Sequence, residues 1–328
     1  MHNSPRILIV KLSSLGDLFH ALPTVHALKE GLGAEIDWVT QPEYESLVAF
    51  FDDVDRVICF PRHNLCKQFN PFLKQLRTTH YDYVIDLQGL MKSALVVAAA
   101  CGKRKLGPSG AREGAQLFYH ALAGKKDKER HAAEELLDVV RHLCLPSPKA
   151  LEFPISFPSN APLDDGPHIA LCPRSRAAGK DWPADRFVKV AQALRESRNA
   201  TIHLVGGLTD QTLCETMAEE IGTGAINHAG KTTLIELGSL LKQMNLVITV
   251  DSGPMHMAAA IGTPTLALFG PTSPKRTGPY GSQHRVIEST FNAGGKKISK
   301  KTRQRDMRYI EAIPVEKVIS TAKEMIAT

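Results

Sequence analysis

The sequence lacks a hydrophobic run long enough to cross a membrane. Its most apolar helical stretch covers only residues 94–100, whereas a membrane-spanning helix needs about 20 apolar residues. A secretory signal is also missing, because the first few residues lead directly into the short apolar segment 7–10. We therefore expect a cytoplasmic protein that can lie on a membrane surface without crossing it.

Metal-binding and redox patterns are missing as well. The six cysteines are scattered, and no two have the Cys-x-x-Cys spacing of zinc sites and redox pairs. The one Asp-x-Asp pattern, Asp53 and Asp55, precedes an expected strand and indicates a turn. We therefore expect free thiols in a reducing compartment, and neither a metal nor another cofactor in the chemistry.

The composition excludes a disordered chain and favours anionic partners. Hydrophobic residues make up 43% of the 328 residues and charged residues 23%, which is ordinary for a globular protein. The formal net charge is +6, and Lys and Arg are dense at 296–308, where the chain could contact lipid head groups or an anionic substrate. We expect no nucleic-acid partner, because no helix-turn-helix, zinc finger or aromatic-interleaved RNA motif is present.

Short β-branched segments alternate with helical patterns in both halves of the chain. Such alternation predicts α/β domains, each with a parallel sheet covered by helices on both faces. The length suggests two cores, and a proline-rich stretch divides the pattern. We predict domains at 1–155 and 168–312, a linker at 156–167 and a C-terminal helix at 313–328 that could pack back on the first half. The expected strands are 7–10, 36–40, 56–60, 83–86, 168–172, 201–205, 246–250 and 265–269, and a long helix is expected at 131–143.

A glycine-containing turn follows the apolar segment 246–250 in the second half. Ser252 suits the N-cap of the next helix, and a proline suits its first turn. Amides at such a helix start can bind a diphosphate, and Gly253 lets the phosphate approach the backbone closely. His256 on the first turn could donate a further hydrogen bond. The alternative interpretation is that Asp251 and Ser252 only cap the helix.

The residues around this turn form a longer signature. It reads Asp-Ser-Gly-Pro-Met-His at 251–256, Ala-Ala-Ala-Ile-Gly-Thr-Pro at 258–264 and Leu-Phe-Gly-Pro-Thr at 268–272. The signature resembles the donor site of glycosyltransferase family 9, the bacterial heptosyltransferases that build the lipopolysaccharide inner core. The resemblance implies a GT-B fold, with two Rossmann-like doubly wound parallel-sheet domains facing across a cleft, and ADP-heptose as the donor. It also implies that Ser252, Gly253 and His256 hold the diphosphate, while Asp251 binds the heptose.

The first half has a strand-to-helix turn that ends in a carboxylate. Lys11, Ser13, Ser14, Gly16 and Asp17 resemble the family 9 pattern of a Lys, two hydroxyl residues and Gly-Asp before a helix. The resemblance implies that Asp17 is the general base and that the other four contact the acceptor. A helix start, however, stabilises the charged carboxylate, so desolvation would have to raise its pKa. The alternative is that Asp17 only caps the helix.

The segments 86–94, 117–119 and 128–134 look like the heptosyltransferases that add the first heptose to Kdo-lipid A. The resemblance implies contacts between basic or polar side chains and the carboxylates and phosphates of this acceptor. The alternative for each basic residue is a solvated surface. The candidate acceptor-binding residues here are Arg62, Gln88, Lys92, Arg112 and His131.

Two turns in the second half complete the candidate donor site. Lys180 directly precedes Asp-Trp-Pro, and the resemblance implies that it neutralises the donor diphosphate. Ser175 lies where the family usually has small hydroxyl residues, and Asp210 stands loosely in the place of a ribose-binding Glu. Lys180, His256 and a helix dipole could stabilise the leaving diphosphate without a metal. The resemblance implies inversion at the sugar carbon.

Three functions follow in order of preference. The first is a monomeric enzyme that transfers heptose from ADP-heptose to Kdo-lipid A at the cytoplasmic face of the inner membrane. The second is a family 9 transferase with another acceptor, such as a core that already carries one heptose or a surface polysaccharide. The third is a non-catalytic nucleotide-sugar binding protein, against which the presence of Asp17 argues.

Overall fold

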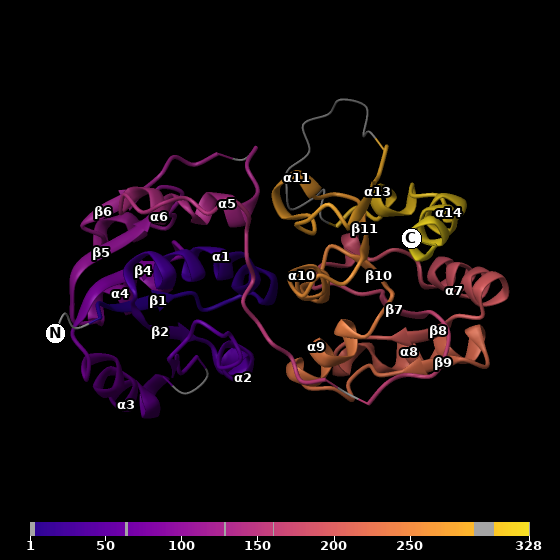
Figure 1. Ribbon diagram of the computed structural model, residues 1–328, viewed down its shortest axis with the longest axis horizontal. Helices are drawn as coiled ribbons and strands as arrows, with labels where there is room; N and C mark the ends of the chain where they lie inside the picture. The colour runs from indigo at the N-terminus through magenta and orange to yellow at the C-terminus, as the bar shows by residue number, and fades with distance from the viewer. Residues whose placement is uncertain (1–3, 63–64, 128, 160, 292–304, 328) are drawn as a thin grey trace. The chain divides into compact units, whose positions relative to one another are not determined.

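The chain forms two compact units. The computed structural model describes residues 4–62, 65–127, 129–159, 161–291 and 305–327. Unit 1 covers Met1–Ser156 and unit 2 covers Phe157–Thr328 (Figure 1). Most of the basic segment 296–308, for which contacts with lipid or substrate were expected, lies outside the described residues.

Unit 1 is built on a six-stranded parallel sheet in the order β3-β2-β1-β4-β5-β6. Because β1 lies between β2 and β4, the sheet has its topological switch point beside β1. Its strands are β1 (Arg6–Val10), β2 (Glu35–Thr40), β3 (Arg56–Cys59), β4 (Tyr81–Asp86), β5 (Gly102–Pro108) and β6 (Ala121–Ala123). Its helices are α1 (Leu15–Leu32), α2 (Glu45–Val48), α3 (Leu65–Arg77), α4 (Met91–Ala99), α5 (Ala132–Leu136) and α6 (Asp138–His142), with the 3-10 turns η1 (Pro42–Tyr44) and η2 (Ala115–Phe118).

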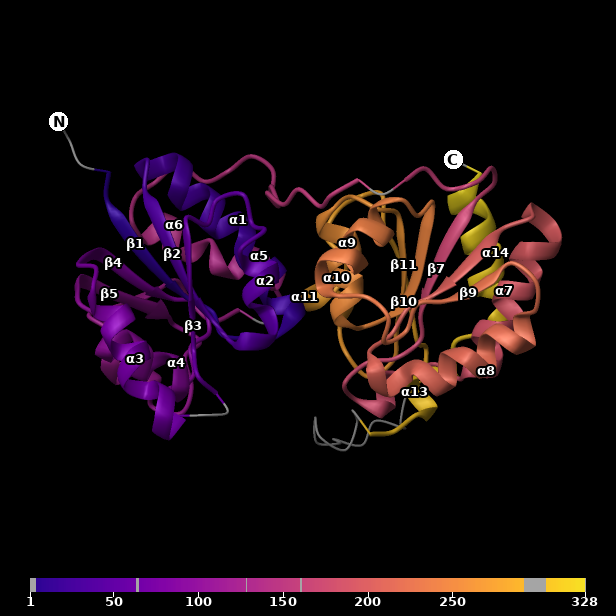
Figure 2. The same cartoon turned by 90° about the horizontal axis from the view of Figure 1, so that it is seen from below.

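The core of unit 1 follows from the continuous apolar character of its central strands. Four residues of β1 are fully buried, as expected for a strand covered by helices on both faces. Figure 2 shows α1 on one face of the sheet and α3 and α4 on the other. Gly33 ends α1 in the left-handed conformation (φ 58°), which glycine adopts without steric cost. Because the central strands are packed on both faces, the loops that follow them start from fixed positions.

Two features of unit 1 differ from the sequence prediction. The helix expected at 131–143 is interrupted between α5 and α6. In a continuous helix, the Glu134 carbonyl would accept from the Asp138 amide. Here it accepts from the Arg130 guanidinium at 2.6 Å. Strand β5 and the edge strand β6 were not predicted. In β5, a Cβ on Gly107 would lie 2.1 Å from a ring atom of Tyr119, so this strand needs glycine where a strand pattern would have a side chain.

Unit 2 repeats this topology with the order β12-β11-β10-β7-β8-β9. The prediction of two doubly wound parallel sheets is thus confirmed. Its strands are β7 (His168–Cys172), β8 (Thr201–Leu204), β9 (Ala225–Asn227), β10 (Leu246–Val250), β11 (Thr265–Phe269) and β12 (Arg285–Glu288). Its helices are α7 (Ala184–Arg198), α8 (Gln211–Ile221), α9 (Leu234–Lys242), α10 (Gly253–Ala260), α11 (Pro274–Thr277), α13 (Arg308–Glu311) and α14 (Val315–Ile326), with the turns η3 (Ala178–Lys180) and η4 (Leu208–Asp210).

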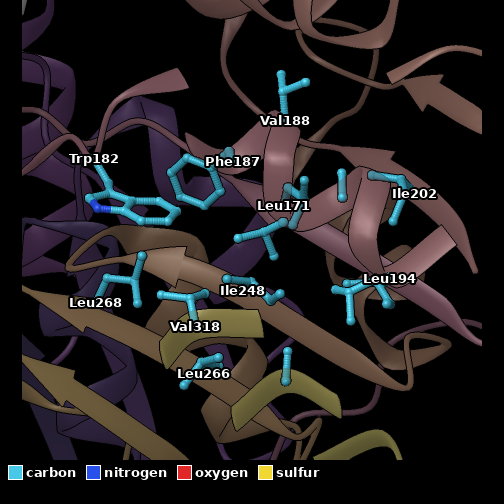
Figure 3. Packing of buried hydrophobic residues seen from close by; sticks show 14 of the residues in the cluster. Leu171, Trp182, Phe187, Val188, Leu194, Ile202, Ile248, Leu266, Leu268 and Val318 are labelled. Carbon is cyan, nitrogen blue, oxygen red and sulfur yellow. The ribbon is translucent and has the colours of Figure 1, made fainter. Parts of the chain in front are cut away.

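The C-terminal helix belongs to unit 2. Figure 2 shows α7, α8 and α14 on one face of its sheet and α9 and α10 on the other. Val318 and Ala322 of α14 are fully buried in the core of this unit, where Figure 3 shows Val318 close to Ile248 and Leu266. The sequence suggested that this helix could pack back on the first half; its apolar stripe is instead covered by α7 and β10.

The proline-rich stretch between the halves also contributes to unit 2. Phe157 is buried, and its ring occupies the space that a side chain on Gly238 of α9 would need. Lys242 of the same helix donates to the Phe157 carbonyl at 3.3 Å. The start of the predicted linker is therefore packed on α9 rather than solvated.

Candidate functional site

The switch point of unit 2 brings together the two turns that the sequence singled out. Because β7 and β10 are neighbours, the segments that leave their carboxyl ends lie side by side. Lys180 follows β7 through η3, and its Nζ lies 2.7 Å from Oδ2 of Asp251, directly after β10. Thr272, after β11, donates its hydroxyl to the same oxygen at 2.7 Å. Three strand ends thus converge on one carboxylate.

The ion pair adds a partner to a residue that the sequence assigned to the donor diphosphate. The ammonium of Lys180 contacts the mostly buried Asp251 in the structure. An ammonium has three N–H donors, so the pair leaves Lys180 able to bind a phosphate oxygen as well. Asp251 keeps Oδ1 without a hydrogen-bond partner within the described ranges, and that oxygen can accept from a sugar hydroxyl.

The start of α10 is arranged as an anion site. Ser252 has an extended backbone and makes no side-chain cap to the first turn of this helix; its hydroxyl is instead 3.0 Å from that of Thr249. Since the Ser252 side chain does not cap this turn, the backbone amides of Gly253 and Met255 at the start of α10 can donate to another acceptor. His256 is the fourth residue of α10 and is partly buried. The predicted diphosphate residues lie together on one helix turn.

The other two predicted donor residues are engaged within their own loops. Ser175 donates its amide to Asp181 at 2.7 Å and its hydroxyl to the Ala177 carbonyl at 2.9 Å. Asp210 accepts from the Gly207 amide at 2.8 Å. Arg174 joins the two loops, with contacts to Asp181 (3.0 Å) and Asp210 (3.8 Å). Burial raises the pKa of Asp181, and the hydrogen bonds from Ser175 and the charge of Arg174 oppose this effect.

The loop that precedes the candidate base, Asp17, lies at the switch point of unit 1. Since β1 pairs with β4, the loop at 11–14 lies beside the turn at 87–90. Oε1 of Gln88 accepts from the amides of Leu12 and Ser13, both at 3.1 Å. The ammonium of Lys11 is buried and donates to the Leu87 carbonyl at 2.6 Å. Lys11 and Gln88 thus hold the loop in place, a role that the sequence did not indicate.

Asp17 lies in the first turn of α1 and does cap it. Its Oδ2 accepts from the amide and the hydroxyl of Ser14, at 2.9 and 2.7 Å. Gly16 is buried, and the Ser13–Ser14 peptide bond is cis. The capping alternative is thus part of the geometry, and it fixes the position of the carboxylate at the carboxyl end of β1.

A buried carboxylate accepts hydrogen bonds from the backbone of the Gln88 turn. Asp86 is fully buried and accepts from the amides of Gln88 (2.7 Å) and Gly89 (2.9 Å) and from the Tyr119 hydroxyl (2.7 Å). Burial raises the pKa of Asp86, an effect that these donors oppose. The sequence did not assign Asp86 or Tyr119, because nothing in the chain order shows that they meet.

The basic candidates lie on different elements of unit 1. Arg112 donates its amide to the Gly89 carbonyl at 2.9 Å, so its loop contacts the Gln88 turn, and Lys92 is exposed on the first turn of α4. Arg62 follows β3, where it contacts Gln41 and Glu43. His131 is the N-cap of α5 and accepts from the Ala133 amide at 3.2 Å. Arg112 is thus joined to the turn whose Gln88 holds the loop before Asp17.

Two kinds of feature are absent from the residues that the structure describes. In the ranges given above, no group of three or more His, Cys, Asp and Glu residues could hold a metal ion. No described helix combines the length and the apolar character that a membrane crossing requires.

Comparisons with known proteins identify the family and the fold. The family model "Glycosyltransferase family 9 (heptosyltransferase)" matches residues 70–307. The chain is 30% identical over 304 residues to lipopolysaccharide heptosyltransferase 1 of Pseudomonas aeruginosa, covering 87% of this chain and 84% of that protein. It is 29% identical over 314 residues to lipooligosaccharide heptosyltransferase 2 of Haemophilus influenzae, covering 86% and 88%. The solved structure of the Escherichia coli heptosyltransferase WaaC with ADP has a TM-score of 0.84 and 26% identity, covering 98% of this chain and 99% of that one. The predicted GT-B fold class is thus confirmed.

Proposed function

Because the chain belongs to glycosyltransferase family 9, the heptosyltransferases, we propose that it transfers heptose from ADP-heptose to the Kdo sugar of Kdo-lipid A. The observation that carries the proposal is the cluster at the switch point of unit 2. There Lys180, Asp251 and the start of α10 combine a cation, a carboxylate and the backbone amides of a helix start that the Ser252 side chain does not cap. These are the groups that a diphosphate-linked sugar requires.

The donor would bind with its diphosphate on the first turn of α10. The helix dipole and the Lys180 ammonium both favour negative charge there, and His256 lies on the same turn. Their attraction grows as ADP leaves, because the departing diphosphate gains charge as the glycosidic bond breaks. Asp251 Oδ1 would accept from a hydroxyl of the heptose, which orients the sugar carbon.

Asp17 would act on the acceptor. Its carboxylate takes the proton from a Kdo hydroxyl, the oxygen forms a bond to the anomeric carbon of heptose, and the bond to the diphosphate oxygen breaks on the opposite side. This direct displacement inverts the sugar carbon and releases ADP. The charge on ADP is met by Lys180 and the α10 amides, so the proposed mechanism needs no metal.

A donor and acceptor panel tests this function. Purified protein is incubated with Kdo-lipid A and, separately, with ADP-heptose, ADP-mannose, a UDP-sugar or a GDP-sugar, and products are identified by mass spectrometry. We expect one heptose on Kdo-lipid A from ADP-heptose and far less product from the other donors. Transfer from a UDP- or GDP-sugar but not from ADP-heptose would overturn the assigned donor.

The relatives also suggest a second candidate acceptor. The chain is 29% identical to a heptosyltransferase 2, close to the 30% for a heptosyltransferase 1. The same assay with Kdo-lipid A that already carries one heptose separates the two. The proposal for the first heptose rests on the resemblance of 86–94 and on Arg112 beside the Gln88 turn. A higher kcat/KM for the heptosylated acceptor would replace it by the alternative.

The proposed acceptor also implies a location. Kdo-lipid A is an anionic lipid, and we propose that the chain, with its net charge of +6, binds the cytoplasmic face of the inner membrane peripherally. Sedimentation with anionic vesicles should be strong at low salt and weak at high salt, because exposed charges are screened. Equal sedimentation with neutral vesicles would contradict this.

A further inference from the structure

Three histidines form a hydrogen-bonded row across the sheet of unit 2. His168 is the first residue of β7, His203 lies in β8 and His228 directly follows β9. Nδ1 of His168 is 3.0 Å from Nε2 of His203, and Nδ1 of His203 is 3.0 Å from Nε2 of His228. His203 points away from the face that carries Ile202 in Figure 3, because neighbouring side chains on a strand alternate.

The far end of the row fixes the tautomer of every member. Nε2 of His168 lies 3.0 Å from the carbonyl oxygen of Asp164 and 3.5 Å from its carboxylate. Both oxygens are acceptors, so in its neutral form His168 carries its proton on Nε2 and accepts on Nδ1. His203 must then donate from Nε2 and accept on Nδ1, and His228 must donate from Nε2 in turn. The remaining nitrogen, Nδ1 of His228, presents a lone pair.

The surroundings of the row favour the neutral forms of His203 and His228. Burial beside the other two imidazoles lowers the pKa of His203 to about 4, and Asp164 opposes this only in part. Burial and the nearby Lys231 ammonium lower the pKa of His228. Protonating His203 would place two N–H groups against each other, whereas the neutral row pairs one donor with one acceptor at each of its two internal hydrogen bonds.

The open end of the row lies at the ligand-binding edge of the sheet. The His228 amide donates to the Leu204 carbonyl at 2.9 Å, and Gly230 donates to Gly206 at 3.1 Å. The segment 228–230 therefore runs beside the turn after β8, which also contains Asp210. Arg174 links Asp210 to the loop of Lys180, so this turn borders the proposed diphosphate site. Nδ1 of His228 has no hydrogen-bond partner among the described residues and is not fully buried.

We propose that Nδ1 of His228 is a hydrogen-bond acceptor for the nucleoside part of the donor, binding either the amino group of the base or a ribose hydroxyl. The inference rests on the proposed function, because it takes a nucleoside diphosphate as the ligand of unit 2. Its physical content is selectivity: a nitrogen that only accepts favours a ligand N–H or O–H and disfavours a carbonyl oxygen at the same place.

Two substitutions separate the acceptor from the row. His228→Gln places an amide nitrogen near the position of Nε2, so it can still donate to His203 but loses the acceptor at Nδ1. His228→Asn places an amide oxygen near Nδ1 and loses the donor to His203. We expect ADP affinity, measured by calorimetry, to fall about tenfold in the Gln variant, a ratio equivalent to about 1.4 kcal/mol. The Asn variant should stay within about threefold of the wild type. Thermal unfolding of each variant confirms that it is folded.

The chemical source of the donor group is identified with altered nucleotides. IDP lacks the amino group of ADP and has an oxygen there, and 2′-deoxy-ADP and 3′-deoxy-ADP each lack one hydroxyl. One of the three should bind the wild type more weakly than ADP, and the His228→Gln variant should lose that discrimination. Equal ADP binding by the wild type and the Gln variant would overturn the inference while the proposed donor stands. No ADP binding by the wild type would overturn both.

Discussion

At the scale of single residues, Asp17 has to cap α1 and to serve as the proposed base. The Ser14 amide and hydroxyl both donate to one of its oxygens, and donors of this kind favour the charged form. They also hold the carboxylate at the end of β1, where an acceptor hydroxyl can reach it. The cap thus makes the Asp17 carboxylate a weaker base but holds it in a fixed position. Exclusion of water by the bound acceptor would raise its basicity again in part.

The pair of Lys180 and Asp251 should divide donor binding into a phosphate part and a sugar part. In Lys180→Met, ADP affinity should fall about tenfold or more, because hydrogen bonds to charged groups contribute about 1.5–3 kcal/mol. In Asp251→Asn, ADP affinity should change little, whereas affinity for an ADP-heptose analogue should fall. Calorimetry with both ligands measures the division. Thr272→Val removes one donor to Asp251 and serves as the milder control; equal losses for ADP in all three variants would contradict the division.

His203 should make unfolding depend on pH. In the unfolded chain it takes up a proton near its ordinary pKa of 6.5, whereas in the folded chain the pKa is about 4. Between these values the unfolded chain binds more protons, so the free energy of unfolding falls as pH is lowered. One pKa unit corresponds to 1.36 kcal/mol, which gives up to about 3 kcal/mol. Urea unfolding of wild type and His203→Phe from pH 7 to 4.5 measures it; parallel pH profiles would show that His203 contributes nothing.

The amino-acid sequence identified most of these residues but not their partners. Asp251, Ser252 and Asp17 stand out because each follows a strand and opens a helix. Thr272, Arg174 and the histidine row were not predicted, because their roles depend on contacts between loops distant in the sequence. A signal for Thr272 was present, since it also follows a strand through a glycine-containing turn.

At the scale of elements, the apolar strands were predictable, whereas the polar or very short ones were not. β1 and β10 are buried on both faces and appear as continuous apolar runs. Strand β5 reads Gly-Lys-Arg-Lys-Leu-Gly-Pro, and β6 and β9 have three residues each. Their register is set by neighbours such as Tyr119 and Val84, whose rings and methyl groups fill the spaces above Gly107 and Gly102. Local patterns do not carry that information.

Gly107 offers a test of how β5 supports the candidate base. Its substitution by Ala would force the Tyr119 ring to move, since the added Cβ would lie 2.1 Å from a ring carbon. The Tyr119 hydroxyl would then leave the buried Asp86, which costs about 1–3 kcal/mol for an unsatisfied group. Tyr119→Phe is the matched control, because it removes only the hydroxyl. Urea unfolding should show a loss for both variants and a larger one for Gly107→Ala; an unchanged midpoint for Tyr119→Phe would show that Asp86 does not need this donor.

At the scale of the whole molecule, the two units have the same strand order and each places its candidate residues at the switch point. In unit 1 the loops after β1 and β4 meet at Gln88, and in unit 2 those after β7 and β10 meet at Asp251. A doubly wound sheet dictates this meeting, which is why strand-end motifs were informative from sequence alone. In the proposed function, unit 2 binds the donor and unit 1 supplies the base.

That division is tested most directly by separating chemistry from donor binding in one variant. Asp17→Asn keeps the size of the side chain and an oxygen for the Ser14 donors but removes the base. We expect transfer from ADP-heptose to Kdo-lipid A to fall by about 10²–10⁴, the usual contribution of a general base, while the affinity for ADP, measured on the same preparation, stays within about twofold of the wild type. Undiminished transfer by Asp17→Asn would contradict the account.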